Sequence, residues 1–275
     1  MVVRGRPTEV GEGYLAFDGT AVERWIAEVS PAEVWFRLIQ GRLPGEGERR
    51  LWDAVLATLA DHGDTPPSTQ AARLVASTGV PLQASLAAGL LAFGNHHAGA
   101  LEGVMEILQS GVARGLDPEA LVDEALASGR RVPGFGHRLH RRDPRVAPLR
   151  CLAEERSLRR DHLAFFSRME DLLGERKGIG GNVDGICGAV LSDLGFPFQA
   201  GRAFFLAGRL PGLTAHILRE SSGGPFRRYA LREVGEESSP LREGLGRAPG
   251  GGFRVSGRRE AREIRRHREP QGERS

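Results

Sequence analysis

The stretch Pro133-Gly-Phe-Gly-His-Arg-Leu-His-Arg-Arg-Asp-Pro-Arg145 is the most informative part of this sequence. It places His137 directly behind two glycines, and glycine lets the backbone come close to a ligand. An Asp-Pro-Arg triplet ends the stretch, and arginine can pair with a carboxylate through two parallel hydrogen bonds. The stretch therefore predicts a loop that binds an anionic ligand.

Two further segments place an ionisable side chain beside glycines at an expected helix start. They are Gly94-Asn-His-His-Ala-Gly-Ala-Leu-Glu102 and Gly181-Asn-Val-Asp-Gly185. A helix start offers free N–H groups and a positive field. Taken singly, a histidine there can be a cap or a packed residue, and Asp184 can simply complement the helix dipole. Taken together and in this order, the three segments indicate a catalytic site.

The sequence around these segments has helical periodicity, and alternating, strand-like stretches are scarce. We therefore predict an all-α fold. Asp117 is an expected N-cap, and Gly195 with Pro197 ends the helix that starts near position 183. A stretch from about 145 to 174 is also helix-prone. The expected buried stripes are Trp52, Val55, Leu56 and Leu59; Leu101, Val104, Met105 and Leu108; Leu121, Val122, Ala125 and Leu126; Leu149, Leu152, Leu163, Phe166 and Leu173; and Val183, Ile186, Val190, Leu191 and Leu194.

Length and composition are those of a soluble globular protein with one large or two small domains. The chain has 275 residues, of which 40% are hydrophobic and 27% charged, and no apolar stretch is long enough to span a bilayer. The N-terminus has no signal-peptide pattern, so we expect a cytoplasmic protein. Cys151 and Cys187 have no metal-type spacing, so we expect no structural metal and a reducing compartment.

Basic charge is concentrated at the C-terminus. Ten Arg and five Glu between positions 241 and 275 give +5, so the first 240 residues carry −2 of the total of +3. The body therefore lacks a basic footprint for nucleic acid, and no nucleic-acid partner is expected. We interpret 236–275 as a disordered basic tail, either without specific function or in contact with RNA or an anionic surface.

In five places the chain resembles the citrate synthase family. These are Leu38-Ile-Gln-Gly-Arg-Leu-Pro44; Asp61-His62 with Ser68-Thr69 and Arg73; His97-Ala-Gly-Ala-Leu-Glu102; Pro133 to His137 with Asp143-Pro-Arg145; and Asn182-Val-Asp184 with Arg209 ahead of Ala215-His216. The resemblance implies condensation of acetyl-CoA with oxaloacetate to citryl-CoA or citrate through an enolate.

Three residues would then be catalytic: Asp184, His97 and His137. Asp184 would remove the methyl proton, for which a carboxylate of ordinary pKa is a weak base, so some desolvation is expected. His97 would donate a hydrogen bond to the thioester oxygen, and the helix start behind it disfavours the imidazolium form. His137 would polarise the ketone and protonate the new alkoxide.

The other expected site residues bind the two substrates. Arg145 and Arg209 would pair with the oxaloacetate carboxylates, assisted by His62 and completed by Arg227 or Arg228. CoA would lie along a loop that includes Val132, Gly134, Phe135 and Gly136, with Arg141 near a phosphate. CoA is a substrate here, and no tightly bound cofactor is expected.

The sequence departs from the family pattern in ways that keep alternatives open. The spacing from His137 to Arg145 is one residue short, and Gly185 replaces an aromatic residue. Both the aspartate segment and the length are similar to citryl-CoA lyase and the corresponding module of ATP-citrate lyase. Citryl-CoA lyase, 2-methylcitrate synthase and a catalytically silent paralogue acting as a subunit therefore remain alternatives.

The resemblance also implies an architecture and an assembly. We expect two helical domains with the site in the cleft between them: 20–98 with 201–235 as the larger, and 99–200 as the smaller. Because one substrate arginine comes from the partner subunit in this family, we expect a homodimer.

Overall fold

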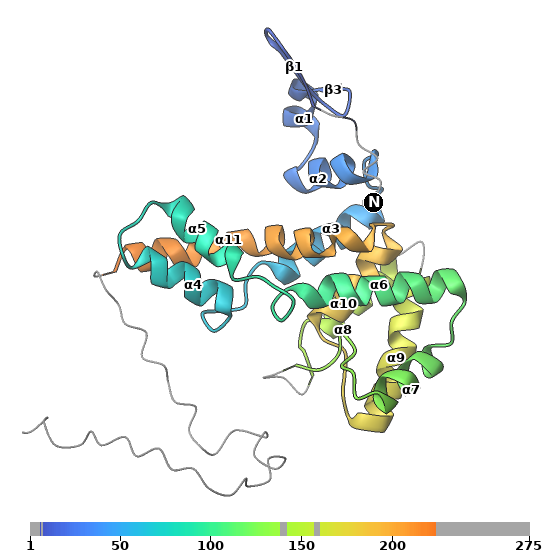
Figure 1. The fold of residues 1–275 in the computed structure, drawn as a ribbon. Coiled ribbons are helices and arrows are strands. Elements are labelled where there is room, and N and C mark those ends of the chain that lie inside the picture. Colours follow the sequence, from blue (N-terminus) through green and yellow to red (C-terminus); the bar gives the residue numbers. More distant parts are fainter. Residues whose placement is uncertain (1–5, 7, 138–141, 157–159, 224–275) are drawn as a thin grey trace, which may run out of the picture. The chain divides into compact units, whose positions relative to one another are not determined.

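The computed structural model describes residues 6, 8–137, 142–156 and 160–223 (Figure 1). Within these ranges the fold is carried by α-helices, and one small sheet lies at the N-terminal end, so the all-α prediction is confirmed. The helices are α1 (Val22–Glu28), α2 (Pro31–Gln40), α3 (Glu46–Leu59), α4 (Pro67–Ala76), α5 (Leu82–Leu91), α6 (Gly99–Arg114), α7 (Pro118–Ala127), α8 (Val146–Arg156), α9 (Asp161–Lys177), α10 (Val183–Asp193) and α11 (Gly201–Ser221), with a 3-10 turn at Phe198–Ala200.

The sheet has three antiparallel strands in sequence order, β1 (Glu9–Gly11), β2 (Tyr14–Phe17) and β3 (Thr20–Ala21). The Trp25 indole of α1 donates hydrogen bonds to the carbonyl oxygens of Phe17 and Thr20, at 3.2 and 3.0 Å. These bonds hold α1 against the strands. The strands themselves are too short to produce the alternating pattern by which a strand is recognised in sequence.

Helix starts follow local capping chemistry. The Ser30 hydroxyl and the Glu33 carboxylate form a capping box at α2, and the Asp117 carboxylate accepts the Glu119 amide at 3.0 Å, as predicted. The helix-prone stretch around 145–174 forms two helices, α8 and α9, rather than one. Both caps use side chains within three residues of the helix start, so these two helix starts are fixed locally.

The core is built around α6 and α10, which pack on each other, and α10 also packs on α9 (Figure 1). Nearly all of α10 is buried, and a Cβ at Gly188 would lie 2.6 Å from a Val104 methyl group of α6. The predicted stripe of α6, Leu101 to Leu108, is fully buried. Since α10 is fixed along its whole length, the Asp184 carboxyl at its start has a fixed position.

Several sequence predictions fall outside these observations. The tail at 236–275 lies outside the described residues, and the division into 20–98 with 201–235 and 99–200 stays a prediction. So does the cytoplasmic location. None of the helices in the described ranges is both long and apolar enough to cross a membrane.

Candidate active site

Asp184 is the second residue of α10, just behind its N-cap. The Asn182 side-chain oxygen accepts hydrogen bonds from the amides of Asp184 and Gly185, at 3.0 and 3.2 Å, and so fixes the first turn. The Asp184 carboxyl is buried, and its Oδ1 has no hydrogen-bond partner among the described residues. Burial raises its pKa to about 6, although the charges of Arg145 and Arg209 act in the opposite direction.

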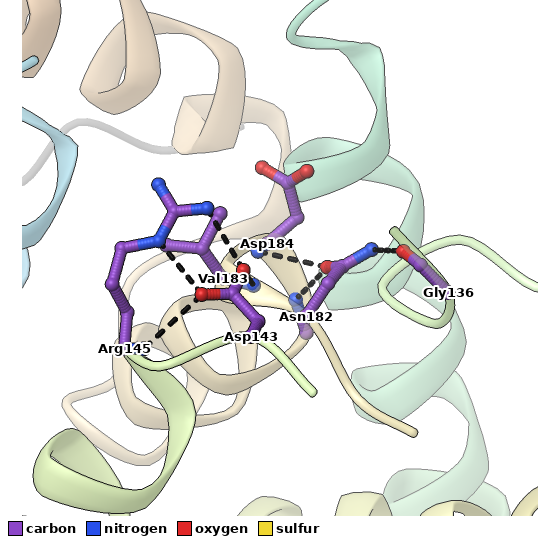
Figure 2. Close-up of polar contacts among 7 residues, drawn as sticks. Gly136, Asp143, Arg145, Asn182, Val183 and Asp184 are labelled. Atoms are coloured by element: carbon purple, nitrogen blue, oxygen red, sulfur yellow. Dashed lines mark hydrogen bonds and ion pairs between the residues drawn. The ribbon is translucent and has the colours of Figure 1, made fainter. Parts of the chain in front are cut away.

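The Asp143 carboxylate joins the Asp-Pro-Arg triplet to the start of α10 (Figure 2). It accepts two hydrogen bonds from the Arg145 guanidinium, at 2.9 and 2.8 Å, and one from the Val183 amide at 3.0 Å. Burial alone would raise the pKa of Asp143, but the Arg145 hydrogen bonds and charge lower it to about 2. Asp143 therefore stays ionised and holds the Arg145 guanidinium beside the helix that carries Asp184.

The glycine loop that follows Val132 is joined to the segment before α10 by backbone hydrogen bonds. Gly136 donates to Gly180 at 2.8 Å, Asn182 donates to Gly134 at 3.0 Å, and the Asn182 side chain donates to the Gly136 oxygen at 2.7 Å. Gly134 has φ +85°, which favours glycine, and a Cβ there would lie 2.8 Å from the Gly185 Cα. Loop and helix are thus in direct backbone contact, which explains why residue 185 has no side chain.

Two imidazoles and two guanidinium groups converge near this carboxyl. The rings of His62 and His137 lie 5.6 Å apart between centroids, at 85° to each other. Burial lowers the pKa of His62, and the positive charges of Arg145, Arg209 and His137 lower it further. Such a concentration of positive charge and N–H donors is suited to a ligand with more than one carboxylate.

Arg209 lies in the middle of α11 and is 2% exposed. Its Nε donates to the Leu59 carbonyl oxygen at 2.8 Å, and its guanidinium lies 5.0 Å from the centre of the Phe205 ring. Burial lowers the pKa of this guanidinium, while the charges of Asp61 and Asp184 raise it. The side chain is therefore held in one orientation within reach of the Asp184 charge.

His97 is enclosed by aromatic rings and bonded to a serine. Its Nε2 lies 2.8 Å from the Ser68 hydroxyl of α4. The Phe93 ring stacks on the imidazole at 4.7 Å, and the Phe205 ring meets it edge-on at 6.3 Å. The next residue, Ala98, has φ +75°, a conformation that costs a non-glycine residue about 1 kcal/mol. The imidazole orientation is thus set by both its neighbours and its backbone.

The structure brings most of the predicted site residues together. The charges of Arg145 and Arg209 act on the pKa values of both His62 and Asp184, His137 lies beside His62, and His97 and Arg209 both contact Phe205. The loop residues Gly134 and Gly136 contact the helix start that carries Asp184. Three predicted residues lie outside the described ranges, namely Arg141, Arg227 and the alternative Arg228.

Three residues that hold the site in place were not predicted as site residues. Asp143 was seen only as part of a motif, and Asn182 only as the neighbour of Asp184. Ser68 was likewise seen only as part of a motif, because its contact with His97 depends on the packing of α4 near the turn at 94–97. Among the described residues no group of three or more His, Cys, Asp or Glu is placed to hold a metal ion.

Comparisons with known proteins agree with this geometry. The profile of the citrate synthase C-terminal domain matches residues 44–230. The citrate synthase of Heyndrickxia coagulans is 29% identical over 221 residues, covering 78% of this chain and 58% of that protein. The citrate/2-methylcitrate synthase of Bacillus subtilis is 29% identical over 204 residues, covering 72% and 54%. The chain thus spans little more than half the length of these curated relatives.

One solved structure matches over nearly its whole length. The citryl-CoA lyase of Hydrogenobacter thermophilus is 36% identical, with a TM-score of 0.77, and the match covers 86% of this chain and 94% of that one.

Proposed function

Because the chain belongs to the citrate synthase family, we propose that it makes and breaks the bond between the methyl carbon of acetyl-CoA and the keto carbon of oxaloacetate, with citryl-CoA as the condensation product. The observation that carries this proposal is the buried Asp184 carboxyl beside two arginines. It is a general base with a raised pKa, next to positive charges suited to a dicarboxylate.

In condensation, Asp184 removes a proton from the acetyl methyl group. Its pKa of about 6 leaves the carboxyl largely ionised at neutral pH while making it a stronger base than an ordinary aspartate. Burial also removes the water that would otherwise solvate the carboxylate. His97 stabilises the thioester oxygen as the enolate forms, and the Ser68 hydroxyl and Phe93 ring hold its imidazole in place.

The enolate carbon then attacks the keto carbon of oxaloacetate. His137 polarises the ketone and transfers a proton to the oxygen that becomes the alkoxide. Arg145 and Arg209 bind the carboxylates, and His62, whose pKa is lowered, donates a hydrogen bond as a neutral imidazole. Arg227 or Arg228 completes the set.

CoA binds as a substrate along the loop that includes Val132, Gly134, Phe135 and Gly136, with Arg141 at a phosphate. The support for this is local: the loop is bonded through Asn182 to the start of α10. A thioester bound along this loop would be presented to the base at a fixed distance.

Cleavage of citryl-CoA is the second candidate, and it uses the same groups in reverse. The observation that favours it is the match with the Hydrogenobacter citryl-CoA lyase over 94% of that chain, whereas the curated synthase relatives are covered to little more than half. The glycine at position 185 also agrees with the short, lyase-like form of the aspartate segment.

The test is to incubate the pure protein separately with acetyl-CoA plus oxaloacetate and with citryl-CoA, and to identify the products. Propionyl-CoA in place of acetyl-CoA tests the 2-methylcitrate alternative. Exchange of the acetyl-CoA methyl protons in the presence of an oxaloacetate analogue isolates the first step. We expect exchange by the wild type and none by Asp184→Asn. If neither the wild type nor Asp184→Asn exchanged these protons, the result would instead support a catalytically silent subunit.

We also propose that the active form is a homodimer. Helix α5 is apolar around nearly its whole circumference, and such helices are normally covered. Leu91 of α5 is nevertheless 85% exposed, and Leu74 of the adjoining α4 is 54% exposed. A second copy on this face would cover them. We expect Leu91→Glu to sediment as a monomer, and Val10→Glu, at a residue 80% exposed in β1, to sediment as the wild type does. A wild type that is monomeric and fully active would refute the dimer.

A further inference from the structure

Helix α11 contacts the segment that carries His62 at successive turns. The Arg209 Nε donates to the Leu59 oxygen at 2.8 Å, and the Gly212 amide donates to the Ala60 oxygen at 3.1 Å. One turn further on, the His216 Nε2 lies 3.1 Å from the Asp61 Oδ1. The helix and the segment therefore run together up to the residue that precedes His62.

The close approach depends on a glycine. A Cβ at Gly212 would overlap the Ala60 carbonyl oxygen and lie 2.9 Å from the Asp61 Oδ1. Residue 211 is a proline inside α11, so that position has no N–H to donate. Backbone contact at Gly212 sets the position of the next turn, and His216 is the residue four positions later that reaches Asp61.

The Asp61 carboxylate acts on the backbone of His62. Burial acts to raise its pKa, but the neighbouring amides of His62 and Gly63 and the His216 imidazole lower it. Arg145 and Arg209 are near enough to the His62 imidazole for their positive charges to lower its pKa. Asp61 thus connects a side chain of α11 to the backbone from which the His62 imidazole projects.

A pocket of about 410 Å³ is lined by both partners of this contact, together with Gly63, Asp64, Arg73 and Arg219. The Asp61 side chain is 48% exposed, whereas that of His216 is 11% exposed. A half-exposed aspartate without a fixed partner would adopt several rotamers. The less exposed His216 imidazole of α11 restricts Asp61 to the rotamer in which its carboxylate lies beside the His62 backbone.

We propose that His216 is a positioning residue for oxaloacetate binding: it holds the Asp61 carboxylate in place, and through it the backbone and imidazole of His62. This inference rests on the proposed function, in which His62 binds oxaloacetate. His216 itself does not touch the substrate. Its loss should therefore weaken oxaloacetate binding and leave both the acetyl-CoA interaction and the proton abstraction by Asp184 largely intact.

The test compares His216→Leu with His216→Gln, because a glutamine amide can still donate a hydrogen bond to Asp61. We expect His216→Leu to raise the KM for oxaloacetate about tenfold, with kcat changed less than about threefold and the KM for acetyl-CoA unchanged, since one charge-assisted hydrogen bond is lost. His216→Gln should recover most of the loss. A purely structural role would lower stability in both variants without this split.

The matched control is His162→Leu, which removes another histidine–aspartate pair, that of His162 and Asp193 at 2.9 Å. We expect it to lower the melting temperature and leave the KM for oxaloacetate unchanged. An unchanged KM in His216→Leu, no recovery in His216→Gln, or an equal KM rise in His162→Leu would each overturn the proposal.

Amide hydrogen exchange of the 59–64 segment gives a readout that needs no turnover. We expect faster exchange in His216→Leu and wild-type exchange in His216→Gln. If the wild type neither condenses acetyl-CoA with oxaloacetate nor cleaves citryl-CoA, the proposed function fails. The amide exchange measurement alone then decides whether His216 holds the His62 backbone. Unchanged exchange in His216→Leu would then refute the positioning role.

Discussion

Replacing Asp184 by asparagine should make the folded protein more stable at neutral and alkaline pH while it abolishes the proposed chemistry. The carboxyl is buried, and its pKa is raised from 3.8 to about 6. Folding therefore disfavours the ionised form relative to the unfolded chain, where the carboxyl titrates normally. The side chain proposed as the base therefore destabilises the fold in its ionised state.

The size and sign of the effect follow from the two pKa values. A shift of about two units corresponds to about 3 kcal/mol, since each unit is worth about 1.4 kcal/mol. Below pH 3.8 the carboxyl is protonated in both states and costs nothing. The cost grows as pH rises from 3.8 and is complete above about 6. Asp184→Asn, which has no ionisable carboxyl, should be about 3 kcal/mol more stable than the wild type at pH 8, and this advantage should fall to about 0.5 kcal/mol near pH 4.

Urea denaturation from pH 4 to pH 8 measures this difference. With a slope near 3 kcal/mol per molar, the variant's midpoint at pH 8 should lie about 1 M above that of the wild type. The control is Asp143→Asn, which removes the carboxylate that pairs with Arg145. Its carboxyl has a pKa lowered to about 2, so it stabilises the fold above pH 3.8, and that stability is lost as pH falls towards 2. This second variant should therefore be less stable than the wild type by about 2 kcal/mol or more at pH 8.

A lower midpoint for Asp184→Asn than for the wild type at pH 8 would refute the reasoning. So would a difference of constant size from pH 8 to pH 4, because a cost that does not follow the titration of the carboxyl cannot come from its charge.

Two further predictions test how the site is held. Gly185→Ala should lose about 2 kcal/mol or more of folding stability, together with activity, because the new methyl group overlaps the carbonyl oxygen of Gly134 in the facing loop. The control is Gly174→Ala in α9, where nothing lies within 4 Å of the added Cβ. Its free energy of unfolding, measured by heat or urea, should rise by about 0.5–1 kcal/mol. Ser68→Ala should slow the exchange of the acetyl-CoA methyl protons about tenfold, because the His97 imidazole loses the hydrogen bond that holds it. The control is Ser85→Ala, which removes a hydroxyl without a partner among the described residues and should exchange these protons at the wild-type rate. Equal rates in the two serine variants would contradict the role given to Ser68.

The helices could be predicted wherever one face is apolar and the other polar. In the predicted stripe of α3, Trp52, Val55 and Leu59 are buried as expected, and Leu56 is partly buried. Helix α5 gave no such signal, because its apolar residues occupy nearly all its faces. Helical periodicity is visible in a sequence only when one face of the helix is apolar and the other polar, so a helix that is apolar on nearly all faces gives no periodic signal.

The candidate site could be predicted as far as its chemistry is local. Asp184 and its cap Asn182 are neighbours in sequence and belong to one recognised segment. The contact of His216 with Asp61 joins residues 155 positions apart and depends on the close approach at Gly212 of α11. Likewise, the burial that raises the Asp184 pKa comes from the packing of several helices, which no single segment of the sequence predicts.

The backbone bonds between Gly134, Gly136 and the residues before α10 have a consequence for substrate choice. The loop proposed to bind the thioester and the proposed proton acceptor are joined by these bonds, so widening the space between them would break the bonds. In the proposed mechanism, room for an acyl group with one more carbon would then come from the aromatic rings around His97. Selection between two- and three-carbon acyl groups should accordingly be altered by substitutions at Phe93 or Phe205 and remain insensitive to changes in the loop.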